Sequence, residues 1–245
     1  NGTSGAHTVQ LKAASGSGAT VTFSTTDKGY KIIYLDGVAT NTGVFDTGAT
    51  GLTFKEGGTN FTNSLLVGTD STGTLSSADG NTGVGTGVLG ALTTGDNNVA
   101  VGLNALDLNT TGTNNVAVGC GALLSNTTGC CNTAIGRNAL DANTTANHNT
   151  AVGMSSLGAN TTGTANTALG KDSLATNSTG GNNVAVGNCA LAVNTASNNV
   201  AVGTSALIAN TTGTRNVAVG KDSMLSSTTA SDSVMIGFTS GDAIT

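Results

Sequence analysis

The chain has 245 residues and a formal net charge of −5, with only eight Lys and Arg residues. It therefore lacks the basic stripe that neutralises phosphates, and nucleic acid is not an expected partner. Charged residues make up 9% and aromatic residues 3%, with 37 Gly and no Pro or Trp, unlike an average globular domain. The apolar residues are mostly Ala, Val and Leu, which favours a thin core repeated along an axis. No apolar run approaches the roughly 20 residues of a membrane helix, so no membrane insertion is expected.

Residues 1–62 contain most of the aromatic side chains and share no period with the rest of the chain. They include alternating runs separated by Gly-rich turns, which are typical of strands, at 7–13, 19–25, 30–36 and 52–57. We interpret 1–62 as a small N-terminal β module that caps the following array and takes part in assembly. The polar opening at Asn1 shows no signal-peptide pattern, consistent with an exported protein whose signal has been removed.

From residue 63 to the end, the sequence repeats every 17 residues. Successive units begin at Asn63, Gly80, Asn97, Asn114, Cys131, His148, Ala165, Asn182, Asn198, Arg215 and Asp232. One unit, 182–197, has 16 residues. The unit NNVAVGLNALDLNTTGT, residues 97–113, defines positions 1 to 17. A single short unit buries nothing alone, so the period predicts an all-β protein: a β-solenoid of about eleven coils over 63–245. At about 4.8 Å per coil it would form a rod of roughly 50 Å.

Each coil has four diagnostic positions. Positions 3 and 5 are mostly apolar, as in Val99 and Val101, with a small residue such as Ala100 between them. This alternation predicts a short strand with its β-branched residues on one face. Position 6 is always Gly, which predicts a corner that needs positive φ or space for the next coil. Position 10, as in Leu106, is expected to be the second core anchor.

Asn dominates positions 2 and 13, where identical amides in register can hydrogen-bond along the stack. Position 13 also begins Asn-x-Ser/Thr acceptor patterns. If it faced solvent, glycans would line the rod; if it faced inward, the pattern would be a by-product of an Asn ladder followed by a Thr ladder. The candidate N-glycosylation residues are Asn60, Asn109, Asn126, Asn143, Asn160, Asn177 and Asn210.

The sequence indicates little chemistry of other kinds. Cys120, Cys130, Cys131 and Cys189 are candidates for intersubunit disulfides, since Cys120 and Cys189 lie four coils apart, too far for an intrachain bond. The alternative is that they are small thiols tolerated at variable positions. His7 and His148 have no suitably spaced partners for a metal, and no catalytic constellation is present. We expect no enzyme activity, cofactor or metal.

The motifs NNVAVG and NTAIG resemble the head repeats of trimeric autotransporter adhesins. The longer AVGxxAL and NTTG pattern resembles arrays in phage tail-fibre-like and other surface fibre proteins. The resemblance covers about residues 63–237 and implies a fibrous protein at a cell or virion surface, with homotrimers in the adhesins. The unit here is longer than the adhesin unit, and no stalk, anchor or chaperone domain is seen after Thr245.

The last coil keeps its strand and Gly but loses the Asn-Thr-Thr turn, and no bulky cap follows it in this sequence. An unshielded coil exposes backbone, which predicts that the N-terminal segment of another subunit covers it by strand addition. We therefore expect an extracellular fibre or pilus-like filament that assembles head-to-tail as a homopolymer. The alternatives are a tail-fibre or trimeric adhesin shaft that binds a host surface and, with less support, an ice-binding solenoid. Besides copies of itself, as a homopolymer or homotrimer, the chain has covalent glycans as a candidate partner.

Overall fold

The computed structural model describes residues 45–46, 53–58, 61–68 and 75–242. They belong to the second of two compact units, Gly43–Thr245. Its strands form one sheet in chain order: β1 Phe45–Asp46, β2 Thr53–Gly58, β3 Phe61–Val67, β4 Thr82–Val84, β5 Val99–Val101, β6 Val116–Val118, β7 Thr133–Ile135, β8 Thr150–Val152, β9 Thr167–Leu169, β10 Val184–Val186, β11 Val200–Val202, β12 Val217–Val219 and β13 Val234–Ile236.

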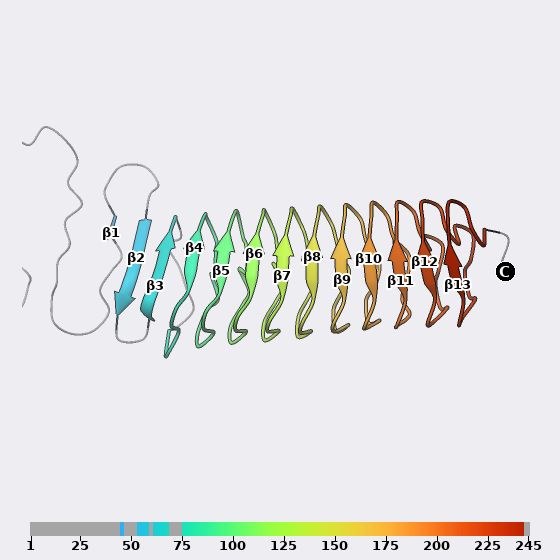
Figure 1. Cartoon of the computed structure of the whole chain (residues 1–245). Coiled ribbons are helices and arrows are strands. Elements are labelled where there is room, and N and C mark those ends of the chain that lie inside the picture. Colours follow the sequence, from blue (N-terminus) through green and yellow to red (C-terminus); the bar gives the residue numbers. More distant parts are fainter. Residues whose placement is uncertain (1–44, 47–52, 59–60, 69–74, 243–245) are drawn as a thin grey trace, which may run out of the picture. The chain divides into compact units, whose positions relative to one another are not determined.

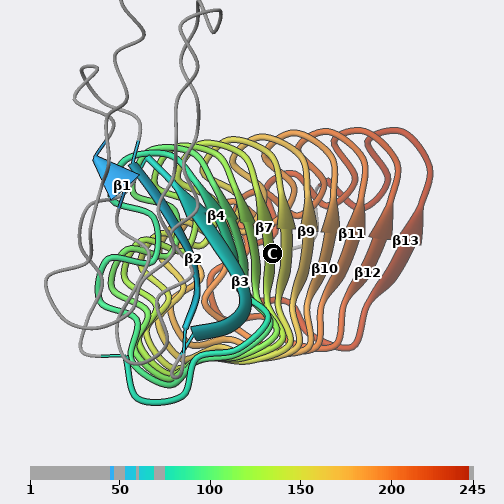
Figure 2. The ribbon, with the colours of Figure 1, turned by 90° about the vertical axis from the view of Figure 1, so that its left-hand side faces the viewer.

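The described chain is all-β, and the expected β-solenoid is confirmed. Strands β1 to β3 pair antiparallel, whereas the eleven strands β3 to β13 stack in parallel over about 10 turns. Figure 1 shows the strands side by side along the stack, and Figure 2 shows the coils nested behind one another. The predicted strand at 52–57 corresponds to β2, and the predicted boundary between residues 62 and 63 falls inside β3. The predicted strands at 7–13, 19–25 and 30–36 lie outside the described residues.

Backbone hydrogen bonds join each coil to the next. The N–H of Val99 donates to the carbonyl of Asn115 (2.8 Å), and the N–H of Gly119 donates to Val101 (2.8 Å). On the opposite side of the coil, the N–H of Leu106 donates to Ala122 (3.0 Å). Stacking therefore satisfies polar backbone groups that an isolated coil would leave open.

The core is narrower than the sequence suggested, because the strands turn their β-branched residues outward. The middle residue of each strand, such as Ala100 or Ala117, is fully buried, whereas Val99 and Val101 are only partly buried. Leu at position 10 fills the other side of the core, as expected, and is also fully buried. The prediction that Leu at position 10 anchors the core is thus confirmed. The other anchor is the small residue at position 4, and the prediction was wrong in placing the valines of positions 3 and 5 there.

The core changes size at both ends of the stack. In the first coil the middle strand position holds Leu66, which is fully buried, and the next coil holds Gly83 there. A Cβ on Gly83 would collide with Leu66 Cδ2, so the small residue makes room for the large one. Near the other end, Met224 replaces the usual Leu and is fully buried. These exchanges keep the core close-packed where the repeat is irregular.

The Gly at position 6 satisfies both reasons for its presence. Gly119 has φ of +137°, and a Cβ there would lie 2.6 Å from the carbonyl of Gly136 in the next coil. Any side chain would therefore suffer both backbone strain and a clash with the next coil.

Buried serines replace Ala at position 9 in some coils. Ser156 and Ser173 are fully buried, and their hydroxyls lie 3.0 Å apart. Ser223 forms the same contact with Ser240, also at 3.0 Å. In each pair the serines occupy consecutive coils, so each buried hydroxyl has a partner directly above or below it.

Candidate interaction surfaces

The amides at position 2 form an unbroken interior ladder. Asn115, Asn132 and Asn149 are fully buried. The N–H of Asn149 donates to Asn132 Oδ1 (2.9 Å), and Asn132 Nδ2 donates to Ala146 O (2.8 Å). The ladder begins at Ser64 Oγ, which accepts from the N–H of Asn81 (2.8 Å), and reaches the N–H of Ser233. The predicted structural role of this position is confirmed.

The candidate glycosylation position also faces inward. Asn109, Asn126, Asn143, Asn160, Asn177 and Asn210 are fully buried. The nitrogen that would carry a glycan is already a donor: Asn126 Nδ2 donates to Asn109 Oδ1 (2.8 Å) and to Gly129 O (3.0 Å). The inward alternative is therefore the one observed, and the folded coils leave no room for a glycan on these amides. Asn60 lies outside the described residues, and glycosylation of the chain stays a prediction.

The two threonines that follow this Asn differ in their contacts. At position 14, Thr110 Oγ1 donates to Thr127 O (3.0 Å), and Thr127 Oγ1 donates to Thr144 O (3.0 Å). At position 15, Thr111 and Thr128 are exposed. The predicted Thr ladder is therefore confirmed for the first residue of each pair, whose hydroxyl is engaged within the stack.

All four cysteines are free. Cys120 and Cys131 are exposed, whereas Cys130 and Cys189 are partly buried. Burial raises the pKa of the Cys130 thiol, and so do a hydrogen bond and charge interaction with Cys131. No two cysteines are bonded within the chain, and intersubunit disulfides stay a prediction.

The positions 3 and 5 of β3 to β13 form a continuous surface, here called the outer sheet face. Every residue at position 5 is Val, Ile or Leu, and position 3 is Val or Leu apart from Thr82, Thr133, Thr150 and Thr167. Several of these side chains are substantially exposed, with Ile135 at 40% and Leu169 at 47%. In the sequence, the small residue at position 4 is the feature that could have predicted this direction, because a narrow core accommodates a small side chain and leaves positions 3 and 5 facing outward.

The last strand, β13, forms the end of the outer sheet face and is its most exposed part. Val234, Ile236 and Phe238 are 65–71% exposed. Among the described strands, β13 pairs only with β12. The N–H of Val217 donates to Ser233 O (2.8 Å) in the next coil, but the equivalent N–H of Val234 has no further coil to meet within the described residues. Within the described residues, no strand pairs with this edge.

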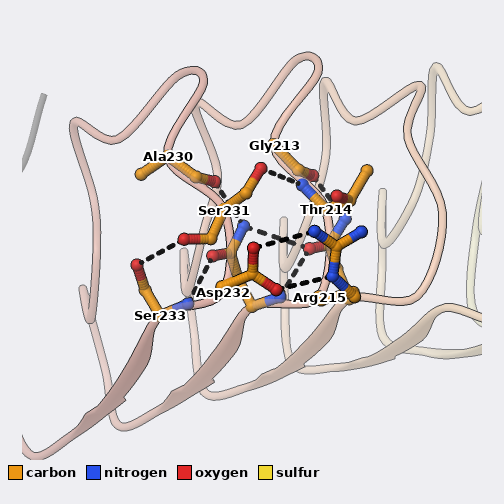
Figure 3. A network of polar contacts seen from close by, with 9 residues as sticks. Gly213, Thr214, Arg215, Ala230, Ser231, Asp232 and Ser233 are labelled. Atoms are coloured by element: carbon orange, nitrogen blue, oxygen red, sulfur yellow. Dashed lines mark hydrogen bonds and ion pairs between the residues drawn. The ribbon is translucent and has the colours of Figure 1, made fainter.

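Polar contacts attach this last coil to the one before it (Figure 3). Arg215 binds Asp232 through Nε (2.5 Å to Oδ1) and Nη2 (2.8 Å to Oδ2). This hydrogen bonding and the Arg215 charge hold the pKa of Asp232 below its ordinary value. Both side chains are about 60% exposed, so the pair orients the coil more than it stabilises it. Lys221 Nζ also lies 5.4 Å from the ring centre of Phe238.

Chemistry beyond these surfaces is sparse. Burial raises the pKa of Asp107 and of Asp141, in the latter against backbone hydrogen bonds that lower it. Within the part of the chain that the structure describes, no three His, Cys, Asp or Glu residues gather to hold a metal. No helix there is long and apolar enough to cross a membrane.

No protein-family model, no curated protein and no solved structure matches this chain.

Proposed function

We propose that the chain is a structural, non-catalytic subunit of an extracellular fibre in which copies join end to end. The observation that carries this proposal is the edge of β13, whose exposed Val234, Ile236 and Phe238 meet no further strand among the described residues. Unpaired strand edges recruit further strands through backbone hydrogen bonds, and exposed apolar side chains strengthen the contact. The added strand would come from the N-terminal segment of the next copy, within residues 1–62.

The interior of the solenoid supports the same function. Coil-to-coil backbone bonds and the position-2 ladder run along the stack axis, which is the direction in which a fibre bears load. End-to-end addition would continue this bonding from one copy into the next. A tail-fibre or adhesin shaft uses the same stiffness but needs a recognition surface, for which the described residues offer no specific feature. Ice binding has less support, because the position-14 hydroxyls are engaged in coil-to-coil bonds.

The test compares Val234→Pro with Val234→Thr. Proline removes the forward-facing N–H and is tolerated on an edge strand, whereas threonine keeps the N–H on a β-branched residue. We expect filaments from the full chain and from Val234→Thr in electron micrographs, and dispersed particles from Val234→Pro. Circular dichroism checks that both variants retain their strands. Absence of filaments in the unmodified chain at high concentration, or filaments unchanged in folded Val234→Pro, would refute the proposal.

A further inference from the structure

The outer sheet face combines three properties. It contains no charged residue at either of its two positions in any of the eleven strands, β3 to β13. It is exposed in the middle of the stack as well as at its ends, as Ile135 and Leu169 show. Its strands are in register, so that Val101 pairs with Val118 and Val118 with Ile135. Exposed apolar patches of this extent mark interaction sites on soluble proteins.

The borders of this face are more polar than its centre. On one side lies position 7, where the exposed Arg137, Lys171 and Lys221 are interspersed with the exposed apolar Leu103, Met154 and Phe238. On the other lies position 1, with Asn114, Asn182 and other exposed polar residues. An apolar centre with a polar rim is the usual anatomy of a protein–protein interface. The neutral centre excludes recognition by charge and requires an apolar partner.

We propose that the outer sheet face binds the same face of a second copy of this chain. A partner must offer apolar groups every ~4.8 Å over a length of about 50 Å to match this surface, and the chain itself has such a surface. Two β-branched faces pack at about 10 Å with their side chains interdigitated. The contact is self-complementary, so it closes as a pair.

The size of the face suits a stable pair. With a length of about 50 Å and a width of roughly 12 Å, two facing copies would bury on the order of 1,200 Å², within the range of specific interfaces. A comparable patch is not found at position 12, where the exposed Leu108 and Val193 are separated by Ala, Ser and Thr in the intervening coils. This sideways contact uses side chains along the whole face, whereas the end-to-end contact uses the backbone edge of β13; only Val234 and Ile236, at the end of the face, belong to both.

The experiment measures the mass of the Val234→Pro chain in solution, where end-to-end growth is blocked, across a range of concentrations. We expect a species of two chains. Ile135→Lys with Leu169→Lys places charges in the centre of the face and should weaken pairing by about 100-fold or more. The matched control is Leu108→Lys with Val193→Lys, which replaces equally exposed apolar residues outside the face and should leave the mass unchanged.

A single chain at every concentration overturns the proposal, and so does pairing that survives in the face variant or is lost equally in the control. Binding of the unpaired chain to neutral phosphatidylcholine vesicles, lost in the face variant, would make lipid the occupant and also overturn it. A three-chain species would also overturn the proposal, because a self-complementary contact closes with two chains. Failure of this proposal leaves the filament test unaffected. Filaments one chain wide would show end-to-end contacts without sideways pairing, whereas paired chains that form no filaments would show sideways pairing without end-to-end contacts.

Discussion

At the scale of single residues, buried amides hold consecutive coils together. Asn132 accepts the backbone N–H of Asn149 and donates to Ala146 O. It is fully buried, so water cannot replace it as a partner. A buried polar group without its partner costs more than the net value of one hydrogen bond, and this asymmetry makes the amide specific for its site.

Replacing Asn132 with Ala should therefore destabilise the solenoid by about 1–3 kcal/mol, because the buried N–H of Asn149 loses its partner and Ala146 O keeps only Asn143 Nδ2 (3.2 Å). Chemical denaturation measures the effect. Asn188→Ala is the matched control, since Asn188 is exposed and makes one weak contact of 3.3 Å with Lys171 O. Equal losses in the two variants would show that the ladder contributes no special stability.

The sequence predicts the contacts of some of these buried residues but not of others. Asn at position 2 of most coils indicates a ladder, since identical amides in register can bond to one another. The sequence does not decide whether the side chain at position 13 points inward or outward, because both arrangements give the same period. The exchange of Leu66 for space at Gly83 could not be predicted, as it requires knowing that both residues meet in the core.

At the scale of the coil, the 16-residue unit 182–197 is the one irregular step. It lacks one residue of the turn, yet the position-2 ladder passes through it, with the Asn199 N–H 2.9 Å from Asn183 Oδ1. The position-13 ladder does not: Asn177 Oδ1 is buried without a partner. In most regular coils the N–H groups at positions 14 and 15 both donate to the next coil, as Thr110 and Thr111 do to Thr127 O, although in the coil 131–147 only Thr144 does so. Ser178 and Thr179 have no such bond among those of the described residues.

Inserting a Thr between Thr195 and Ala196 should repair this step. The new turn would match that of the coil 131–147, which reads Asn-Thr-Thr-Ala-Asn. We expect a gain of about 1–2 kcal/mol from restored hydrogen bonds, and slower hydrogen exchange of the Ser178 and Thr179 amides.

The control inserts a Thr between Thr128 and Gly129, which lengthens a regular coil to 18 residues and should destabilise it. If the Ser178 and Thr179 amides already exchange as slowly as those of Thr110 and Thr111, the step is not weak.

At the scale of the whole stack, each coil contacts mainly its two neighbours, as in other solenoids. The sequence predicted this architecture because its period is nearly perfect. It misplaced the valines because alternation identifies two faces of a strand without saying which is buried. In a core as narrow as this one, the small residue is the one that fits inside.

Deleting one whole coil, 131–147, should therefore leave a folded solenoid with its melting temperature lowered by only a few degrees, because the flanking coils meet with the same positions aligned. Deleting residues 131–138 removes half a coil and should disrupt the stack. Circular dichroism and thermal unfolding distinguish the two. Equal disruption by both deletions would contradict nearest-neighbour stability.

The serine pairs bear on how such a chain avoids folding wrongly. A protein of near-identical coils has many almost-correct structures, in which one coil loops out and the next takes its place at little cost. Ser156 and Ser173 disfavour one such error: if the coil 165–181 looped out, Ser156 would face Ala190 and lose its 3.0 Å contact with the Ser173 hydroxyl, keeping only a bond to a backbone carbonyl like the one it now makes to Ala168 O. These departures from perfect repetition thus favour the correct order of coils when the chain folds.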